Sequence, residues 1–192
     1  MLETDRFAKI EIESLADLER WLTRHHAQNE SVWMVRFKKS VPAKYVDRLD
    51  TIDLLLCFGW VDGLARKLDD DRTMQLISRR RQQAWAQSYK DRAERLMETG
   101  RMRPAGLAAI SESQMLGLWD AYAESDALIV PDDLKAALAN RPPAEAYFGA
   151  AAPSYRRNVL RWISSAKQEA TRQKRIELTV SFSARDEKVP QM

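Results

Sequence analysis

The sequence has few of the residues that build metal, disulfide and phosphate sites. It contains one cysteine, Cys57, and two histidines, His25 and His26, in 192 residues. A single cysteine excludes an intramolecular disulfide, and adjacent histidines point to different sides of a helix, so they cannot readily chelate one ion together. The six glycines form neither a GxGxxG nor a Walker pattern, so the sequence predicts no phosphate-binding loop. We expect neither a metal nor a cofactor.

Long apolar runs are also missing. No stretch of about 18 apolar residues is present in the sequence, so it predicts no membrane-spanning helix. The first residues, MLETDRFAKI, lack the basic head and apolar core of a signal peptide. The lone cysteine is typical of a reducing compartment. Together these features predict a cytoplasmic protein.

The sequence does have enough apolar residues for a packed core. Apolar residues make up 45% of the chain, and the formal net charge is only +3. The charge is unevenly distributed, because residues 72–103 contain nine Lys or Arg against Asp91, Glu94 and Glu98. Such a local excess favours contact with an anion, a phosphate or an acidic protein.

Hydrophobic periodicity predicts a mixed architecture in the first part of the chain. Alternation of apolar and polar residues predicts four strands: Arg6–Ile12, Ser31–Lys38, Trp60–Lys67 and Arg72–Arg79. Helical spacing predicts a helix after Ser14, one capped by Asp50 or Thr51 that ends at Gly59, one over residues 84–99 and one from Pro104. The sequence therefore predicts an α+β domain over residues 1–120, with a small antiparallel or mixed sheet and packed helices.

The remainder of the chain is predicted to be helical. Residues 120–126 are polar and weakly periodic, which indicates a linker or domain boundary. Asp132 is expected to cap a short helix, Pro142 and Pro143 to end it, and Pro153 to begin another. These signals predict an all-helical C-terminal segment over residues 130–185.

Several motifs carry a family resemblance, and they occur in the same order as in that family. They are Ser31–Lys39, Cys57–Gly63, Lys67–Asp70, Glu94–Leu107, Val130–Leu134, Pro153–Arg157, Trp162–Lys167 and Thr171–Arg172. Through them nearly the whole chain resembles the bacterial YdeI/OmpD-associated family (OmdA), also described as bacteriocin-protection proteins. The resemblance implies a role in tolerance of bacteriocins and cationic antimicrobial peptides, in part association with an outer-membrane porin, and no established reaction.

The sequence departs from the family pattern at one turn. Family members carry Ser-Pro-Arg-Arg followed by a Ser-x-Trp-Ser step, whereas here Ser78 is followed by Arg79-Arg80-Arg81 and Trp85 by Ala86. The missing proline loosens the turn, and the missing hydroxyl groups remove hydrogen-bond donors.

One group of charged and aromatic residues could form a pocket if the predicted strands pair in one sheet. Its ligand-binding candidates are Lys38, Lys39, Trp60, Asp62, Arg79 and Trp85. Trp60 and Asp62 are two residues apart and share one face of a strand, so a carboxylate, cations and aromatic walls could converge on an anionic ligand. The alternative is structural: Trp60 and Trp85 belong to the core, and Asp62 pairs with a nearby Lys or Arg. Cys57, within an apolar run, is expected to be a buried structural thiol.

Three functions remain open at this point. The leading one is a cytoplasmic, non-enzymatic binding or stress-tolerance protein whose partner is an unknown protein or a small anionic ligand. The second is an enzyme in which Asp62 acts as acid or base and Lys38 or Arg79 holds an anionic substrate. The third, less favoured, is nucleic-acid binding through basic and aromatic residues of the helical segment: Tyr155, Arg156, Arg157, Arg161, Trp162, Lys167 and Arg172. The sequence does not determine the oligomeric state.

Overall fold

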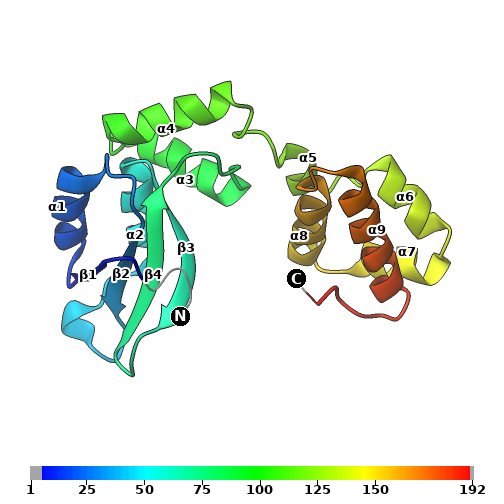
Figure 1. Cartoon of the computed structure of the whole chain (residues 1–192), viewed down its shortest axis with the longest axis horizontal. Helices are drawn as coiled ribbons and strands as arrows, with labels where there is room; N and C mark the ends of the chain where they lie inside the picture. Colours follow the sequence, from blue (N-terminus) through cyan, green and yellow to red (C-terminus); the bar gives the residue numbers. More distant parts are fainter. Residues whose placement is uncertain (1–5, 191–192) are drawn as a thin grey trace. The chain divides into compact units, whose positions relative to one another are not determined.

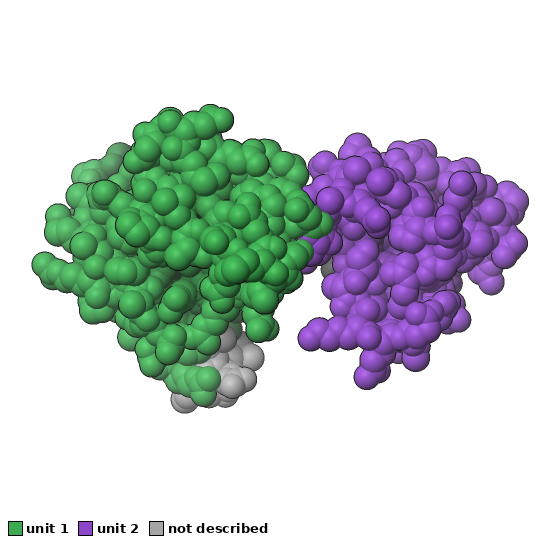
Figure 2. Space-filling view, turned by 90° about the horizontal axis from the view of Figure 1, so that it is seen from above, with its two compact units in different colours: residues 1–120 green, residues 121–192 purple. Residues whose placement is uncertain are grey.

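The computed structural model describes residues 6–190, and the chain divides into two compact units, residues 1–120 and residues 121–192 (Figure 2). The first unit combines a sheet with helices and the second is helical, which confirms the α+β fold with a helical C-terminal segment. The elements of the first unit are β1 (Lys9–Ile12), α1 (Leu15–His25), β2 (Val32–Phe37), the short 3-10 helix η2 (Pro42–Lys44), α2 (Arg48–Cys57), β3 (Trp60–Lys67), β4 (Arg72–Arg79), α3 (Gln87–Glu98) and α4 (Pro104–Met115).

The sheet of the first unit has four strands in the order β1-β2-β4-β3 and is mixed. Strand β1 runs parallel to β2, whereas the β2–β4 and β3–β4 pairs are antiparallel. The predicted strands Trp60–Lys67 and Arg72–Arg79 are confirmed at their predicted boundaries as β3 and β4, which pair as a hairpin. Its acidic turn is held by the Asp69 carboxylate, which accepts hydrogen bonds from the backbone N–H groups of Asp71 (3.0 Å) and Arg72 (2.7 Å), because a short acidic side chain can mimic a backbone turn.

Helix α2 lies at the centre of the first unit. It packs against α1, α3, α4 and β3 (Figure 1), and every residue from Thr51 to Cys57 is buried. Strand residues on one face of the sheet, including Val32, Met34 and Ile77, join the same core. An element buried on all sides needs apolar residues all round, and the run Leu54-Leu55-Leu56 supplies them.

The cap of helix α2 lies three residues before the first predicted cap, Asp50. The prediction that Asp50 or Thr51 caps it is wrong, because Asp47 is the N-cap and its carboxylate accepts a hydrogen bond from the Leu49 N–H at 2.7 Å. Asp50 lies in the first turn instead, where a negative charge is stabilised by the positive end of the helix dipole. Both positions suit an acidic residue, so composition did not distinguish them.

The chain reverses between α2 and β3 at Gly59. Its φ of +72° lies in the left-handed region that favours glycine. A Cβ atom at this position would lie 2.8 Å from the carbonyl oxygen of Ala105 in α4. Gly59 therefore serves both a tight turn and a close approach of two backbones, as its place between an apolar helix and a strand predicted.

Helix α3 begins at Gln87, so the prediction that Trp85 opens this helix is wrong. Trp85 lies in the connection before α3, where its backbone N–H donates to the carbonyl oxygen of Leu118 at 3.0 Å and its side chain is buried. Ala86, at the N-cap, has extended backbone angles. Tertiary packing of a large aromatic side chain decides this position rather than helical spacing.

The second unit contains five helices among its described residues. They are α5 (Ala123–Asp126), α6 (Asp132–Ala139), α7 (Pro142–Ala150), α8 (Pro153–Ser164) and α9 (Glu169–Ser183). The predicted linker at residues 120–126 thus includes the one-turn helix α5, which packs against α8. Asp132 is the first residue of α6 rather than its cap, since Pro131 occupies the N-cap position. Pro142 and Pro153 occupy the first turns of α7 and α8, where a missing N–H costs no intrahelical hydrogen bond.

Candidate functional site

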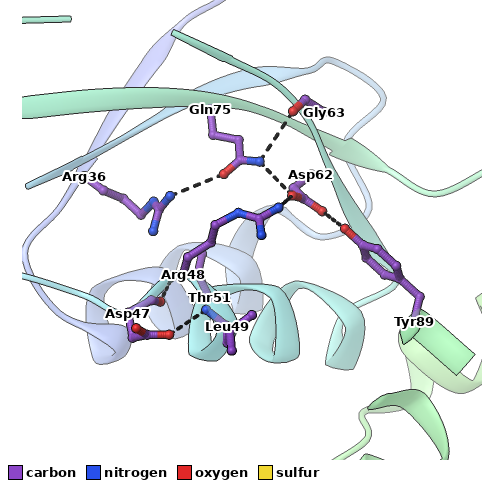
Figure 3. Close-up of polar contacts among 9 residues, drawn as sticks. All are labelled: Arg36, Asp47, Arg48, Leu49, Thr51, Asp62, Gly63, Gln75 and Tyr89. Carbon is purple, nitrogen blue, oxygen red and sulfur yellow. Dashed lines mark hydrogen bonds and ion pairs between the residues drawn. The ribbon is translucent and has the colours of Figure 1, made fainter. Parts of the chain in front are cut away.

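Asp62 lies near the start of β3, on the same side of the sheet as α2 (Figure 3). It pairs with Ile77 of β4, and the ladder shifts register between Asp62 and Ala65, which includes Gly63. A shift of this kind bends a strand and re-aims its side chains. The side chain of Asp62 is only 5% exposed, so its carboxylate needs partners within the protein.

Three donors from three different elements meet the Asp62 carboxylate. Oδ2 accepts hydrogen bonds from a guanidinium nitrogen of Arg48 in α2 at 3.1 Å and from the side-chain amide of Gln75 in β4 at 2.7 Å. Oδ1 accepts a hydrogen bond from the hydroxyl of Tyr89 in α3. Both carboxylate oxygens are therefore engaged (Figure 3), and we name Arg48, Asp62, Gln75 and Tyr89 the Asp62 network.

A second cation lies behind this network. The Gln75 side-chain oxygen accepts a hydrogen bond from Arg36 of β2 at 3.3 Å, and Arg36 also donates to the carbonyl oxygen of Val46 at 3.5 Å. Arg36 is buried, and burial is the main cause that lowers its pKa from the ordinary arginine value. Gln75 thus relays between a buried guanidinium and a buried carboxylate, which orients all three side chains.

Tyr89 is held in its neutral form. Burial, followed by the hydrogen bond to Asp62, raises the pKa of the Tyr89 hydroxyl to about 12. A hydroxyl with that pKa stays protonated at neutral pH and acts as a donor to the carboxylate. The Asp62 network therefore holds β3, β4, α2 and α3 together, and both of its carboxylate oxygens already accept hydrogen bonds from within the protein.

The two lysines predicted at the site lie elsewhere. Phe37, the residue before Lys38, pairs with Arg72. Asp62 pairs with Ile77, five residues further along β4, which corresponds to about 17 Å. The Lys38 ammonium group donates to the carbonyl oxygens of Asp69 (2.7 Å) and Asp70 (2.9 Å) at the hairpin turn. Lys39 lies beside it in the chain, with its ammonium nitrogen 5.7 Å from the centre of the Tyr45 ring. The structure does not bring either lysine to Asp62.

The two predicted tryptophans are core residues. Trp60 is fully buried, its indole N–H donates to the carbonyl oxygen of His26 at 2.9 Å, and its ring meets the edge of Trp21 at 5.3 Å. Trp85 is buried under the guanidinium of Arg80, whose carbon lies 3.9 Å from the ring centre. Desolvation lowers the pKa of Arg80 to about 10. Both tryptophans therefore belong to the core, and Asp62 pairs with Arg48. This is the structural role that the sequence left open as the alternative to a pocket.

Arg79, the remaining predicted residue, is exposed at the end of β4 and lines a pocket of about 170 Å³. The pocket lies where α1, α2, β4 and α4 meet, and its lining includes His26, Phe58, Arg79, Arg80, Ala109 and Glu112. Arg79 pairs with Trp60 of β3 in the sheet. The indole N–H of Trp60 donates to the carbonyl oxygen of His26, which also lines the pocket. This pocket is bounded by Arg79 and Arg80, and Trp60 is not among its lining residues.

Sequence reasoning missed four members of the polar cluster: Arg36, Arg48, Gln75 and Tyr89. For two of them, the sequence pattern could have indicated a buried polar contact. Arg36 alternates with Val32 and Met34 on the core face of β2, and Gln75 shares a face of β4 with buried Ile77, so each is a polar residue at a core position. Such residues need a buried partner. Arg48 and Tyr89 carried no comparable signal, because both are partly exposed helix residues.

Two of the five basic residues predicted for nucleic acid, Arg161 and Arg172, are engaged in ion pairs within the second unit. Arg161 pairs with Asp126, and Arg172 forms a double hydrogen bond to Asp133 at 2.6 and 2.9 Å. The hydrogen bonds from Arg172 lower the pKa of the Asp133 carboxyl group. Tyr155 is buried, and its hydroxyl accepts a hydrogen bond from the Val189 N–H at 3.1 Å. These contacts lock helices to one another, as a structural role requires.

Residues 6–190 show no metal site, membrane span or reactive thiol. This part of the chain holds no group of three or more His, Cys, Asp or Glu side chains placed to bind a metal ion, and none of its helices combines the length and apolarity of a membrane span. Cys57 is buried, and burial raises the pKa of its thiol, which keeps it protonated and unreactive.

Two family models match separate parts of the sequence. Residues 10–109 match a domain of unknown function (DUF8412), and residues 127–185 match the family described as bacteriocin-protection, YdeI or OmpD-associated. The second match confirms the family resemblance for residues 127–185. The motifs quoted from residues 31–107 lie outside it, in the part that matches the first model, so the resemblance does not extend over nearly the whole chain. No curated protein and no solved structure matches the chain significantly.

Proposed function

We propose a protective binding role for this chain, which belongs to the family of the domain of unknown function DUF8412 through residues 10–109. The observation that carries the proposal is the match of residues 127–185 to the bacteriocin-protection, YdeI or OmpD-associated family. We infer a cytoplasmic, non-enzymatic protein that raises the tolerance of its cell to bacteriocins and cationic antimicrobial peptides. It does so by binding a protein or a small anionic ligand.

The Asp62 network supports binding rather than catalysis. A general acid or base must present a proton or a lone pair to the substrate. Here both Asp62 oxygens accept hydrogen bonds from Arg48, Gln75 and Tyr89, and Tyr89, with a pKa of about 12, holds its proton. A network in which both carboxylate oxygens have partners rigidifies the unit that carries it, which favours a preformed surface over a reaction centre.

Arg79 is the predicted site residue that we retain for ligand binding. It is exposed, lines the pocket beside buried Arg80, and has only Glu112 as an acidic neighbour in the pocket wall. A guanidinium group is well suited to a planar carboxylate or a phosphate. We therefore place the anionic ligand of the first unit in this pocket, rather than at Lys38, Lys39 or Asp62.

The test of the protective role is genetic. A strain lacking the gene is challenged with a panel of bacteriocins and cationic antimicrobial peptides, and survival is compared with that of the parent strain. The deletion strain is expected to be more sensitive, and a plasmid copy of the wild-type gene is expected to restore tolerance. Unchanged sensitivity of the deletion strain to the whole panel rejects the protective role.

The role of the Arg79 pocket is tested in the complemented strain. Arg79→Gln is expected to restore tolerance less well than wild type. Arg101→Gln removes an equally exposed arginine that is not among the residues lining this pocket and is expected to restore it fully. Both variants must accumulate to the wild-type level by immunoblot. Equal tolerance for the two variants removes Arg79 from the proposal and leaves the protective role standing.

A further inference from the structure

The second unit contains a pocket of its own. It lies among α6, α7 and α8 and has a volume of about 370 Å³, near the lower end of the range in which proteins bind small molecules. Its walls are formed by Val130, Lys135, Leu138, Glu145, Phe148, Gly149 and Arg156. These residues fall within the segment 127–185 that matches the bacteriocin-protection family.

The pocket has an apolar base and a charged rim. Leu138 and Phe148 are buried members of the core of the second unit, and Val130 packs against the same core. Lys135 and Glu145 are exposed. An apolar base under a few polar groups is the usual composition of a ligand site, because burial supplies affinity and the polar groups fix the orientation of the ligand.

Among the described arginines of this unit, Arg156 is the one with a buried side-chain nitrogen, Nε, that has no hydrogen-bond partner. Its guanidinium carbon lies 5.7 Å from the centre of the Phe148 ring. Within residues 6–190 the structure gives its side chain no ion pair, whereas Arg161 and Arg172 are each paired with an aspartate. A buried donor without a partner is unfavourable by about 1–3 kcal/mol, so Arg156 gains from an anion that a paired arginine would not need.

We propose that this pocket binds a carboxylate joined to an apolar group, as found at the carboxyl end of a peptide with an apolar last residue or in a free acid of the same kind. Arg156 and Lys135 carry two positive charges against the single negative charge of Glu145, which suits one anionic head group. The guanidinium fork matches the two oxygens of a carboxylate. The apolar group rests on Leu138 and Phe148. This inference depends on the pocket and not on the protective role.

The first experiment compares a charged probe with its neutral counterpart. The full chain is titrated with N-acetyl-leucine and, separately, with N-acetyl-leucinamide, and the backbone amide signals of Phe148 and Gly149 are followed by NMR. The acid is expected to give saturable shifts at these residues, and the amide is expected to bind at least about tenfold more weakly because it lacks the charge-assisted hydrogen bonds. Equal binding of acid and amide, or no saturable shift with the acid, overturns the proposal.

Two neighbouring arginines on α8 provide a matched pair of variants. Arg156→Gln is expected to weaken binding of N-acetyl-leucine by about tenfold or more. Arg157→Gln makes the same charge change one residue away, at a position that is not part of the pocket wall, and is expected to change affinity by less than about twofold. Equal losses in the two variants would mean that only long-range charge matters, and the pocket assignment would fail.

Glu145 gives a test of opposite sign that does not depend on the folding of the Arg156 variant. Glu145→Gln removes a negative charge from an exposed position on the rim, so it is expected to strengthen binding of the acid by about two- to threefold at low salt. A loss of binding in this variant contradicts the proposed pairing of the carboxylate with Arg156 and Lys135.

A third probe separates the two sources of the ligand. An N-acetylated tetrapeptide ending in leucine with a free carboxyl group is compared with N-acetyl-leucine. Tighter binding of the peptide assigns the pocket to peptide carboxyl ends, and equal binding assigns it to the terminal apolar acid itself. If the tetrapeptide does not bind while N-acetyl-leucine does, the ligand is a free acid, and if neither binds the proposal is overturned.

Discussion

The two units bring their helices together differently. In the first unit, α4 lies so close to α2 that a Cβ at Gly106 would be 2.5 Å from the carbonyl oxygen of Cys57. In the second unit, a Cβ at Gly149 of α7 would have no atom within 4 Å, and Gly149 lines the pocket of that unit. The comparison teaches that the first unit uses small residues for backbone-to-backbone packing, whereas the second leaves space beside its helices that a ligand can fill.

Substituting the two helical glycines tests this contrast most directly and should give the largest effect. Gly106→Ala pushes a methyl group into the carbonyl oxygens of Cys57 and Leu56, which belong to backbone and cannot rotate away. We expect a loss of about 3 kcal/mol of unfolding free energy. Gly149→Ala should instead stabilise by about 0.5–1 kcal/mol, because alanine is the better helix former.

Urea denaturation followed by tryptophan fluorescence measures the change in the first unit, since five of the six tryptophans lie in residues 1–120. Amide hydrogen exchange in α7 measures the change in the second. If Gly106→Ala leaves the urea midpoint unchanged, α4 is free to move away from α2 and the tight packing of the first unit is wrong.

The Asp62 network gives the next largest effect. Asp62→Asn replaces one carboxylate oxygen by an amide that cannot accept a hydrogen bond, so a donor from Tyr89, Gln75 or Arg48 is left facing another donor. We expect a loss of about 2 kcal/mol. The matched control is Asp70→Asn in the same hairpin, whose side chain is 96% exposed beside Lys67 and should change stability by less than about 0.5 kcal/mol. Equal small effects for both variants would show that Asp62 does not hold the unit together.

The sequence predicted the backbone of this molecule better than its polar contacts. Alternation gave the hairpin of Trp60–Lys67 and Arg72–Arg79 at its observed boundaries, because one face of the sheet is buried and period-two patterning records that burial. Gly59 was predicted to end a helix, and the chain turns there with a φ of +72°. Helix starts were less accurate, as at Asp47, because Asp47, Asp50 and Thr51 lie within five residues and each has a side chain that can cap a helix.

The side-chain contacts of Asp62 could not be predicted from local sequence patterns. The strand order β1-β2-β4-β3 places Lys38 at the opposite end of the β3–β4 hairpin from Asp62, and this order depends on long-range pairing that local patterns do not encode. Arg48 reaches Asp62 from a helix 14 residues earlier in the chain. A carboxylate on a strand has many cations within reach in sequence, and only the packing of α2 on the sheet selects one.

An alkaline titration tests the neutral state of Tyr89. The pKa of Tyr89 is about 12 in the folded protein against 10 for a free tyrosine. Between pH 10 and pH 12, the Tyr89 hydroxyl therefore loses its proton in the unfolded chain and keeps it in the folded chain. Stability contributed by this group is therefore complete below pH 10 and falls as the pH rises, by about 1 kcal/mol at pH 11. Tyr89→Phe should be less stable at neutral pH, because it loses the hydrogen bond to Asp62, and should show a shallower decline from pH 9.5 to 11. Urea midpoints at each pH give both slopes, and identical slopes would contradict the raised pKa.

An acid titration tests the second unit and should give the smallest effect. The double hydrogen bond from Arg172 lowers the pKa of Asp133 below its ordinary 3.8. The ion pair therefore contributes stability above that value, and the contribution is lost as the pH falls through 3.8 towards the lower folded pKa. Because both side chains are partly exposed, we expect only about 0.5 kcal/mol. Amide exchange at Leu134, measured from pH 5 to pH 3, should lose protection faster in wild type than in Asp133→Asn, which has no proton to take up. If the two proteins lose amide protection in parallel, the Arg172–Asp133 pair does not help to hold α6 and α9 together. Apolar contacts alone would then join these helices, and the second unit would depend on packing in spite of its open pocket.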